Sequence, residues 1–76
     1  MEWIELDNKL TKTFIFKDFA AAIAWMVAAS FEIEKLNHHP EWKNVYNKVE
    51  VVLTTHDAGN TITEKDRILA GKLDAI

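Results

Sequence analysis

Apolar and polar residues alternate along two short stretches near the start of the chain, residues 3–6 and 10–16. Alternation with a period of two places the apolar side chains on one face and is typical of half-buried β-strands. The two stretches are separated by Asp7 and Asn8, which favour tight turns. The pattern therefore predicts an N-terminal β-hairpin.

A second pair of alternating stretches lies at residues 42–45 and 48–56, with Tyr46 and Asn47 between them. On the longer stretch, one predicted face carries Val49, Val51, Leu53 and Thr55, and the other carries Glu50, Val52, Thr54 and His56. This pattern predicts a second hairpin whose last strand ends at His56. The loop predicted after it is Asp57-Ala58-Gly59-Asn60.

Between the hairpins, residues 19–37 predict a helix. Asp18 is a suitable N-cap because its carboxylate can accept N–H groups of the first turn, and Pro40 ends the helix because the residue before a proline avoids helical geometry. Residues 19–31 contain one polar residue, Ser30, so the helix is apolar nearly all round and yet too short to span a membrane. We expect one side to pack on the sheet and the other on a second copy of the chain; the alternative is that the many alanines form a partly exposed helix face.

A second helix is predicted over residues 64–76. Thr63 is its N-cap candidate, and Asp66 at the third helical position resembles the partner residue of a capping box. The apolar side expected for this helix is Ile68, Leu69, Leu73 and Ile76. The element order predicts one α+β domain over residues 1–76: two layers in the order β-β-α-β-β-α, with a four-stranded antiparallel sheet and the helices packed on one face.

Composition narrows the class of protein. The chain has 76 residues, no cysteine and a formal net charge of −3. Without disulfides or a thiolate metal site, a domain of this size gains extra stability from packing or from oligomerisation. Its basic residues are scattered, whereas nucleic-acid surfaces need clustered Lys and Arg, so we expect no nucleic-acid partner. The opening Met1-Glu2-Trp3 is unlike a signal peptide, which predicts a cytoplasmic protein with no membrane partner.

The candidate chemistry lies in the histidines, which are His38, His39 and His56. Histidine exchanges protons near neutrality because its ordinary pKa is about 6.5. Glu34 and His38 are four residues apart, so on a continuous helix they would stack and the carboxylate would favour the imidazolium. The alternative to an acid–base role is an ordinary ion pair on the helix surface, which has the same four-residue spacing. His39 precedes Pro40 and must leave the helix, so its ring points elsewhere.

Other kinds of site find little support in the sequence. The adjacent histidines diverge, and no His-x₃-His spacing is present, so we expect no metal. A serine nucleophile is not expected, because Ser30 is the only serine and has no histidine partner at a useful helical spacing. Gly59 and Gly71 are the only glycines, so there is no glycine-rich phosphate loop.

Together, these residues resemble the signature of the pterin-4a-carbinolamine dehydratases. The matching positions are Glu34, His38, His39, Pro40, Tyr46, His56 and Asp66. Flanking segments such as Phe16-Lys17-Asp18-Phe19 are also similar, and the match runs from Trp3 to the C-terminus. The resemblance implies a hydro-lyase that converts 4a-hydroxytetrahydrobiopterin to quinonoid dihydropterin and water. This reaction recycles tetrahydrobiopterin for a pterin-dependent aromatic amino-acid hydroxylase.

The resemblance also implies roles for single residues and no metal or organic cofactor. His38 and His56 would be general acids for the departing hydroxyl. His39 would bind the pterin and handle its ring proton, and Glu34 would orient His38. The implied substrate-binding residues are His38, His39, Pro40, Thr55, His56, Asp57, Ala58, Asp66 and Trp3. A capping role for Asp66 and a core role for Trp3 stay open.

The same resemblance implies self-association and an alternative function. Members of the family form homo-oligomers, so a dimer or tetramer through helix 19–37 and a sheet edge is expected. Animal relatives also stabilise dimers of a homeodomain transcription factor. The alternative function is therefore a protein-interaction module that acts through the apolar helix at residues 19–31. Longer members have an extra N-terminal helix before the hairpin, which we do not expect in this chain, and Asn37 stands where relatives often have Asp.

Overall fold

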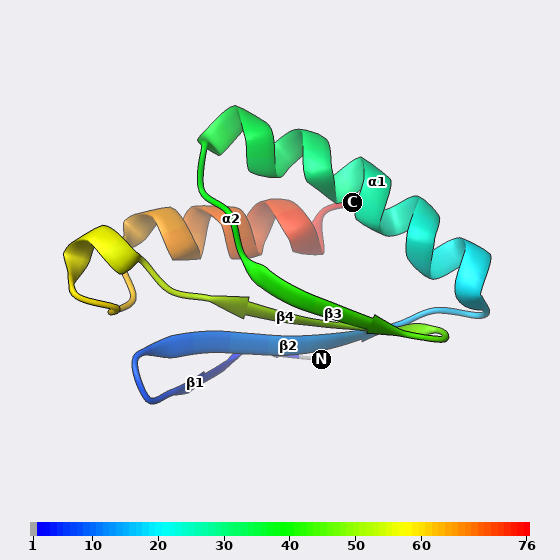
Figure 1. Cartoon of the computed structure of the whole chain (residues 1–76), viewed down its shortest axis with the longest axis horizontal. Helices are drawn as coiled ribbons and strands as arrows, with labels where there is room; N and C mark the ends of the chain where they lie inside the picture. The colour runs from blue at the N-terminus through cyan, green and yellow to red at the C-terminus, as the bar shows by residue number, and fades with distance from the viewer. Residues whose placement is uncertain (1) are drawn as a thin grey trace.

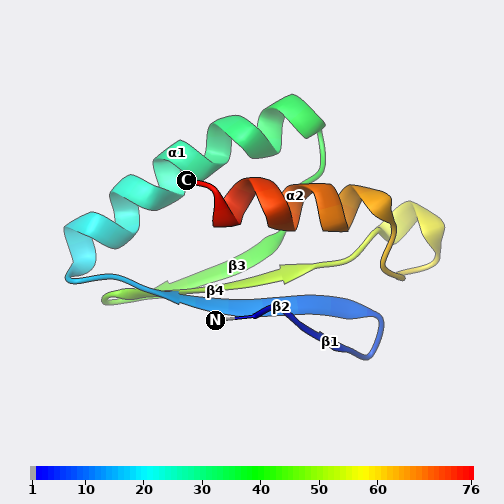
Figure 2. The ribbon, with the colours of Figure 1, turned by 180° about the vertical axis from the view of Figure 1, so that it is seen from behind.

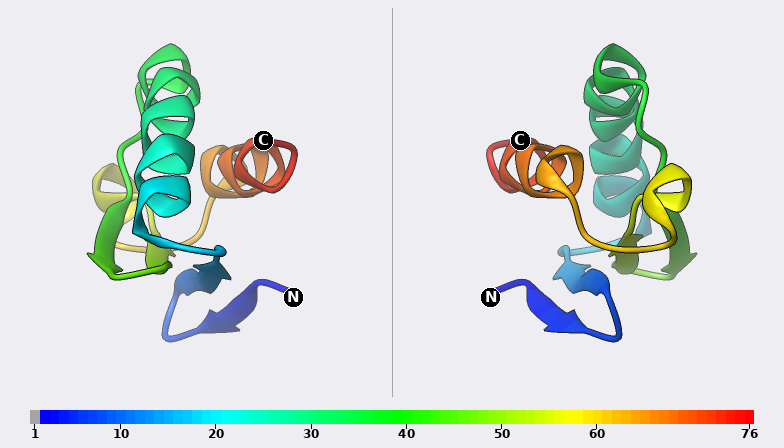
Figure 3. Two further views of the ribbon diagram at one scale, coloured as in Figure 1. Left: turned by 90° about the vertical axis from the view of Figure 1, so that its right-hand side faces the viewer. Right: turned by 90° about the vertical axis from the view of Figure 1, so that its left-hand side faces the viewer.

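The computed structural model describes residues 2–76. Its elements are β1 (Ile4–Leu6), β2 (Lys9–Ile15), α1 (Phe19–Leu36), β3 (Glu41–Val45), β4 (Lys48–Leu53), the 3₁₀ helix η1 (His56–Ala58) and α2 (Glu64–Asp74). The strands form one antiparallel sheet in the order β1-β2-β4-β3. Both helices lie on the same face of this sheet (Figures 1 and 3), and α2 lies in front of α1 when the molecule is seen from behind (Figure 2). The predicted two-layer α+β architecture is confirmed.

Both hairpin turns lie where the turn residues predict them. Asp7 and Asn8 have φ angles of 52° and 61°, the left-handed conformation that a type I′ turn needs at both central residues. The second turn begins at Tyr46, with φ of 52°. Its Asn47 side chain donates to the Phe16 carbonyl at 2.9 Å, and the Asn47 carbonyl accepts from the Phe16 N–H at 2.8 Å. The second turn is thereby fixed to the end of β2.

The core lies between the sheet and the two helices. Its most deeply buried apolar residues are Leu10, Ala22, Ala29, Ile33, Val49, Val51, Leu53, Leu69 and Leu73. Trp25 of α1 packs on Phe14 and Trp42 of the sheet and on Phe16, which directly follows β2, with ring centroids 4.4, 6.4 and 5.5 Å away, respectively. Large aromatic groups dominate the apolar area that a small core can bury, so this cluster fixes α1 on the sheet.

Helix α1 begins as predicted and ends slightly early. Asp18 Oδ1 accepts the Ala21 N–H at 2.8 Å, which confirms the N-cap. The helix ends at Leu36, and Asn37 takes a left-handed conformation with φ of 50°, which asparagine tolerates better than most residues. The chain thus leaves the helix one residue before the predicted end at residue 37, and His38 lies outside the helix.

The strand predicted over residues 48–56 also ends early. β4 stops at Leu53, beyond which neither β2 nor β3 offers a paired residue. Thr55 pairs only with Thr61, in an isolated bridge closed by a 2.9 Å hydrogen bond from the Thr55 N–H to the Thr61 carbonyl. His56 therefore opens η1 and does not end a strand.

Helix α2 buries a different side from the one predicted. Ile68 and Ile76 are 43% and 48% exposed, so their assignment to the apolar side is wrong. The buried residues of the helix are Asp66, Leu69, Ala70 and Leu73. These positions recur every three or four residues and define a single face. The first residue of this buried face is therefore a carboxylate, Asp66. Over residues 2–76, no helix has both the length and the hydropathy to cross a membrane.

Candidate active site

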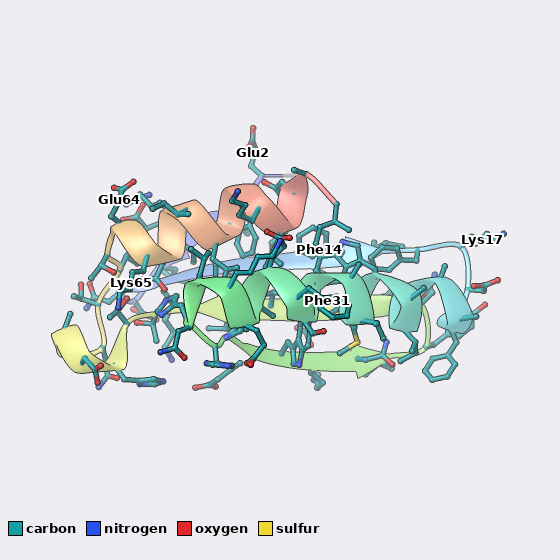
Figure 4. The ribbon with its side chains drawn as sticks, turned by 90° about the horizontal axis from the view of Figure 1, so that it is seen from above. Glu2, Phe14, Lys17, Phe31, Glu64 and Lys65 are labelled. Atoms are coloured by element: carbon teal, nitrogen blue, oxygen red, sulfur yellow. The ribbon has the colours of Figure 1, made fainter. Side chains whose placement is uncertain are left out.

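Three segments meet at one end of the molecule: the end of α1, the 3₁₀ helix η1 and the start of α2 (left in Figure 1). A cavity of about 210 Å³ lies there, and His38, His39 and His56 all line it. The other lining residues are Asn37, Thr54, Thr55, Asp57 and Lys65. Figure 4 shows Lys65 at this end of the molecule, at the start of α2. The fold thus brings all the histidines of the chain to one polar cavity.

His38 is held by a buried carboxylate behind the cavity. Its Nε2 lies 2.5 Å from Oδ1 of Asp66, which has no exposed surface. The other carboxylate oxygen of Asp66 accepts from Thr55 Oγ1 at 2.7 Å and from the Thr63 N–H at 2.8 Å. The contact with Thr63 belongs to the capping box at the start of α2, which the sequence predicts and the structure confirms. Asp66 therefore serves both the helix start and the His38 ring.

Asp66 is ionised despite its burial. Burial alone raises the pKa of this carboxyl, but the hydrogen bonds from His38, the Thr63 N–H and the Thr55 hydroxyl outweigh that effect and hold the pKa below its ordinary value. A carboxylate on one ring nitrogen stabilises the imidazolium and fixes the ring orientation. Because Nε2 is engaged, Nδ1 is the His38 nitrogen that remains for a ligand in the cavity.

Glu34 pairs with His39 and not with His38. Glu34 Oε1 lies 2.7 Å from His39 Nε2, and both side chains are more than half exposed. The predicted stacking of Glu34 on His38 is wrong, because it assumes a helix that continues through His38. The left-handed Asn37 turns the chain, so that His38 points inward to Asp66 and His39 returns to the outer surface of α1.

His56 is held by an amide. Its Nδ1 lies 2.7 Å from Asn60 Oδ1, within the loop that follows β4. Sequence reasoning placed Asn60 in a loop and missed this contact. It also missed Lys65 as a cavity residue, although Lys65 directly precedes Asp66 and so had to lie near the site once Asp66 was placed there.

Some predicted site residues lie outside the cavity. Over residues 2–76, its lining does not include Pro40, Ala58, Trp3 or Asp66. Asp66 lies behind His38, whereas Trp3 lies at the other end of α2, where its Nε1–H donates to Asp74 Oδ2 at 3.0 Å. Residues 66 and 74 are separated by about 12 Å along the helix axis at 1.5 Å per residue. Trp3 packs edge-on against Phe14, which gives it a structural contact in the hairpin.

Fold and site together define a small α+β domain with a cavity lined by His38, His39 and His56. The whole chain, residues 1–76, matches the family model described as pterin 4 alpha carbinolamine dehydratase. The chain therefore belongs to the pterin-4a-carbinolamine dehydratase family.

Individual relatives agree with this membership. Proteins from Rhizobium meliloti and Solibacter usitatus, each named "Putative pterin-4-alpha-carbinolamine dehydratase", are 54% and 50% identical over 74 residues. These matches cover 95% and 97% of this chain and 70% and 77% of the relatives.

Two solved structures share the fold. The crystal structure of a transcriptional coactivator/pterin dehydratase from Brucella melitensis has a TM-score of 0.89 and 45% identity, over 96% of this chain and 79% of that one. A pterin dehydratase-like protein identified as a RuBisCO assembly factor in the alpha-carboxysome has a TM-score of 0.83 at 24% identity, over 99% of this chain and 88% of that one. The second similarity shows the fold alone.

Proposed function

We propose that the protein dehydrates a 4a-hydroxytetrahydropterin in the histidine cavity, with imidazole rings as the proton carriers. The observation that carries this proposal is that His38, His39 and His56 line one cavity, each with one ring nitrogen held by a side-chain oxygen. Family membership supports the substrate class. The physiological setting that fits is recycling of tetrahydrobiopterin after an aromatic amino-acid hydroxylase.

The reaction asks for one proton donor and one proton acceptor. The C4a–O bond breaks as the departing hydroxyl takes up a proton and leaves as water. A ring nitrogen of the pterin loses a proton, and the electron pair left behind forms the new carbon–nitrogen double bond. Each positioned acid or base near its working pH contributes roughly 10²–10⁴-fold. The site gives one proton to the hydroxyl and takes one from the ring nitrogen, so the number of protons on its side chains is unchanged after the reaction.

The contacts of the three histidines support the following proposed roles. His38 is the donor to the hydroxyl, because Asp66 engages its Nε2 and fixes the orientation of a ring that lines the cavity. His56 is the second acid, for a hydroxyl on the opposite face of the ring. His39 contacts the pterin and handles its ring proton, with Glu34 as its orienting partner. Asp66 positions His38.

Stopped-flow dehydration of a 4a-hydroxytetrahydropterin generated in situ tests the proposal. We expect the parent to accelerate dehydration, and His38→Ala, His39→Ala and His56→Ala each to lower kcat by about 10- to 100-fold or more. Glu64→Gln is the matched control, because Glu64 is exposed at the same helix start and does not line the cavity. No acceleration over buffer would overturn the dehydratase assignment, and unchanged turnover in all three histidine variants would overturn the roles of the imidazoles.

A stripe on α1 favours a second function, self-association. Phe19, Ile23, Val27 and Phe31 are between 37% and 63% exposed, and their spacing of four residues forms one ridge along the helix. Figure 4 shows Phe31 on the side of α1 turned away from the sheet. We propose that this ridge packs on a second copy of the chain. A binding partner of another kind is the alternative, which the description of the Brucella relative as a coactivator supports.

Light scattering at micromolar concentration tests self-association. We expect the parent to be an oligomer and Phe31→Lys to shift it toward the monomer, because a buried lysine charge disfavours the contact. Ile68→Lys is the control, since Ile68 is a similarly exposed residue on α2. A monomeric parent would refute the second copy as the partner of the ridge.

A further inference from the structure

His56 differs from the other two histidines in the chemistry of its partner. His38 and His39 contact the carboxylates of Asp66 and Glu34, whereas His56 Nδ1 contacts the neutral amide oxygen of Asn60 at 2.7 Å. An ionised carboxylate places a full negative charge beside the ring and can only accept a hydrogen bond from it. An amide oxygen accepts an N–H from either protonation state and adds no full charge.

The loop after β4 is built so that Asn60 returns to His56. The Thr55–Thr61 bridge closes the loop at its base. Within it, Gly59 and Asn60 have φ angles of 81° and 58°, so two successive left-handed residues reverse the chain at the end of η1. The Gly59 N–H donates to the His56 carbonyl at 3.1 Å. Backbone and side chain thus hold residues 56 and 60 together.

We propose that Asn60 is a positioning residue that keeps the proton on Nδ1 of His56 and makes Nε2 the nitrogen that exchanges protons with the pterin. Over residues 2–76, His56 Nε2 has no hydrogen-bond partner, and the ring lines the cavity. An imidazolium that gives up its Nε2 proton becomes the Nδ1–H tautomer, which is the form that Asn60 Oδ1 accepts from. The return of a proton to Nε2 restores the imidazolium with the same contact.

This inference rests on the proposed dehydratase function and adds a residue outside the family signature. Without an acceptor at Nδ1, a neutral ring can hold its proton on either nitrogen. The titratable or charged groups that share the cavity with His56 are His38, His39, Asp57 and Lys65. The hydrogen bond to Asn60 is the contact that distinguishes the two nitrogens of the ring.

Three variants separate positioning from backbone effects. Asn60→Gly removes the amide while allowing the left-handed backbone, and we expect kcat to fall roughly 3- to 10-fold with KM within about twofold, the size expected for one hydrogen bond. Asn60→Asp keeps an acceptor oxygen and should retain kcat within about threefold of the parent. Asn8→Gly is the matched control, because Asn8 is also a left-handed asparagine, with φ of 61°, in the first hairpin turn. An Asn60→Gly variant with the turnover of the parent would overturn the proposal.

Two further measurements show whether Asn60 acts through His56. In a His56→Ala background, Asn60→Gly should have no further effect on kcat, whereas additive losses would overturn the mechanism. NMR spectra of the folded parent and of Asn60→Gly, each with nitrogen-15-labelled histidine, report the tautomer of neutral His56. We expect the Nδ1–H tautomer in the parent and a mixture of the two tautomers in the variant. An Nε2–H tautomer in the parent would overturn the proposal. This spectrum needs no turnover, so it still decides the contact if the parent fails to dehydrate the pterin.

Discussion

Asp66→Asn tests whether one buried carboxylate holds both the start of α2 and the ring of His38. Oδ2 of Asp66 accepts from Thr55 Oγ1 at 2.7 Å and from the Thr63 N–H at 2.8 Å. An asparagine can keep its oxygen there, because the Thr63 N–H is a fixed donor, and then turns its NH₂ group toward His38. Hydrogen bonds to charged groups contribute about 1.5–3 kcal/mol and neutral ones about 0.5–1.5. Loss of the charge at three contacts, offset by the smaller desolvation cost, gives an expected destabilisation of about 1–3 kcal/mol.

The same substitution should affect turnover more than stability. An NH₂ group facing His38 Nε2 donates to it, which opposes the imidazolium and places the proton of the neutral ring on Nδ1. We expect kcat to fall by about 100-fold or more. Urea unfolding and stopped-flow kinetics on the same preparations measure both effects, with Glu64→Gln as the control, for which we expect a change within about 0.5 kcal/mol. Parent-like stability and turnover in Asp66→Asn would refute the reasoning.

The pH dependence of stability gives an independent check on Asp66. Burial raises the pKa of this carboxyl, and the hydrogen bonds from His38, Thr63 and Thr55 more than compensate, so the pKa in the folded state is lowered. A lowered pKa means that the stabilisation is fully present above the unfolded-state pKa of about 4 and is lost as pH falls through the folded-state value. The difference in unfolding free energy between the parent and Asp66→Asn should therefore shrink below about pH 4. A difference that grows on acidification would contradict the ionised carboxylate.

Further substitutions test contacts around the site and the helix ends. Trp3→Phe removes the 3.0 Å hydrogen bond to Asp74 and should lower the free energy of unfolding, measured by thermal unfolding, by about 1 kcal/mol. KM should not change because Trp3 lies outside the cavity, and a raised KM would place the indole near the pterin. Asn37→Gly should be nearly neutral, whereas Asn37→Val should cost at least about 1–2 kcal/mol at a φ of 50° and lower kcat by displacing His38; equal effects would show that the left-handed turn is unimportant. Asp18→Ala should cost about 1 kcal/mol by removing the N-cap of α1, measurable by urea unfolding, with no effect on kcat.

The sequence predicts the element order because the local signals are strong. Asp7 and Asn8 specify a turn with left-handed residues, and Asp18 is a good N-cap, so both lie where expected. The choice of His38, His39 and His56 as candidate site residues also follows from the sequence. Their partners do not. The partner of Glu34 depends on one residue, because the left-handed Asn37 ends α1 and brings His39, and not His38, to Glu34. A backbone conformation that several residues can adopt is not specified by spacing alone.

Long-range contacts explain the remaining differences. His38 and Asp66 are 28 residues apart, and they meet because the end of α1 and the start of α2 lie at the same end of the sheet. The sequence leaves open whether Asp66 is a capping-box residue or part of the site, and the structure shows that the same carboxylate belongs to the capping box and contacts His38. The two roles reinforce each other, because the cap fixes the carboxylate that orients the ring, and the ring supplies a donor that keeps the buried carboxylate ionised. A substitution that loosens the first turn of α2 should therefore impair His38 even when it leaves every residue lining the cavity in place.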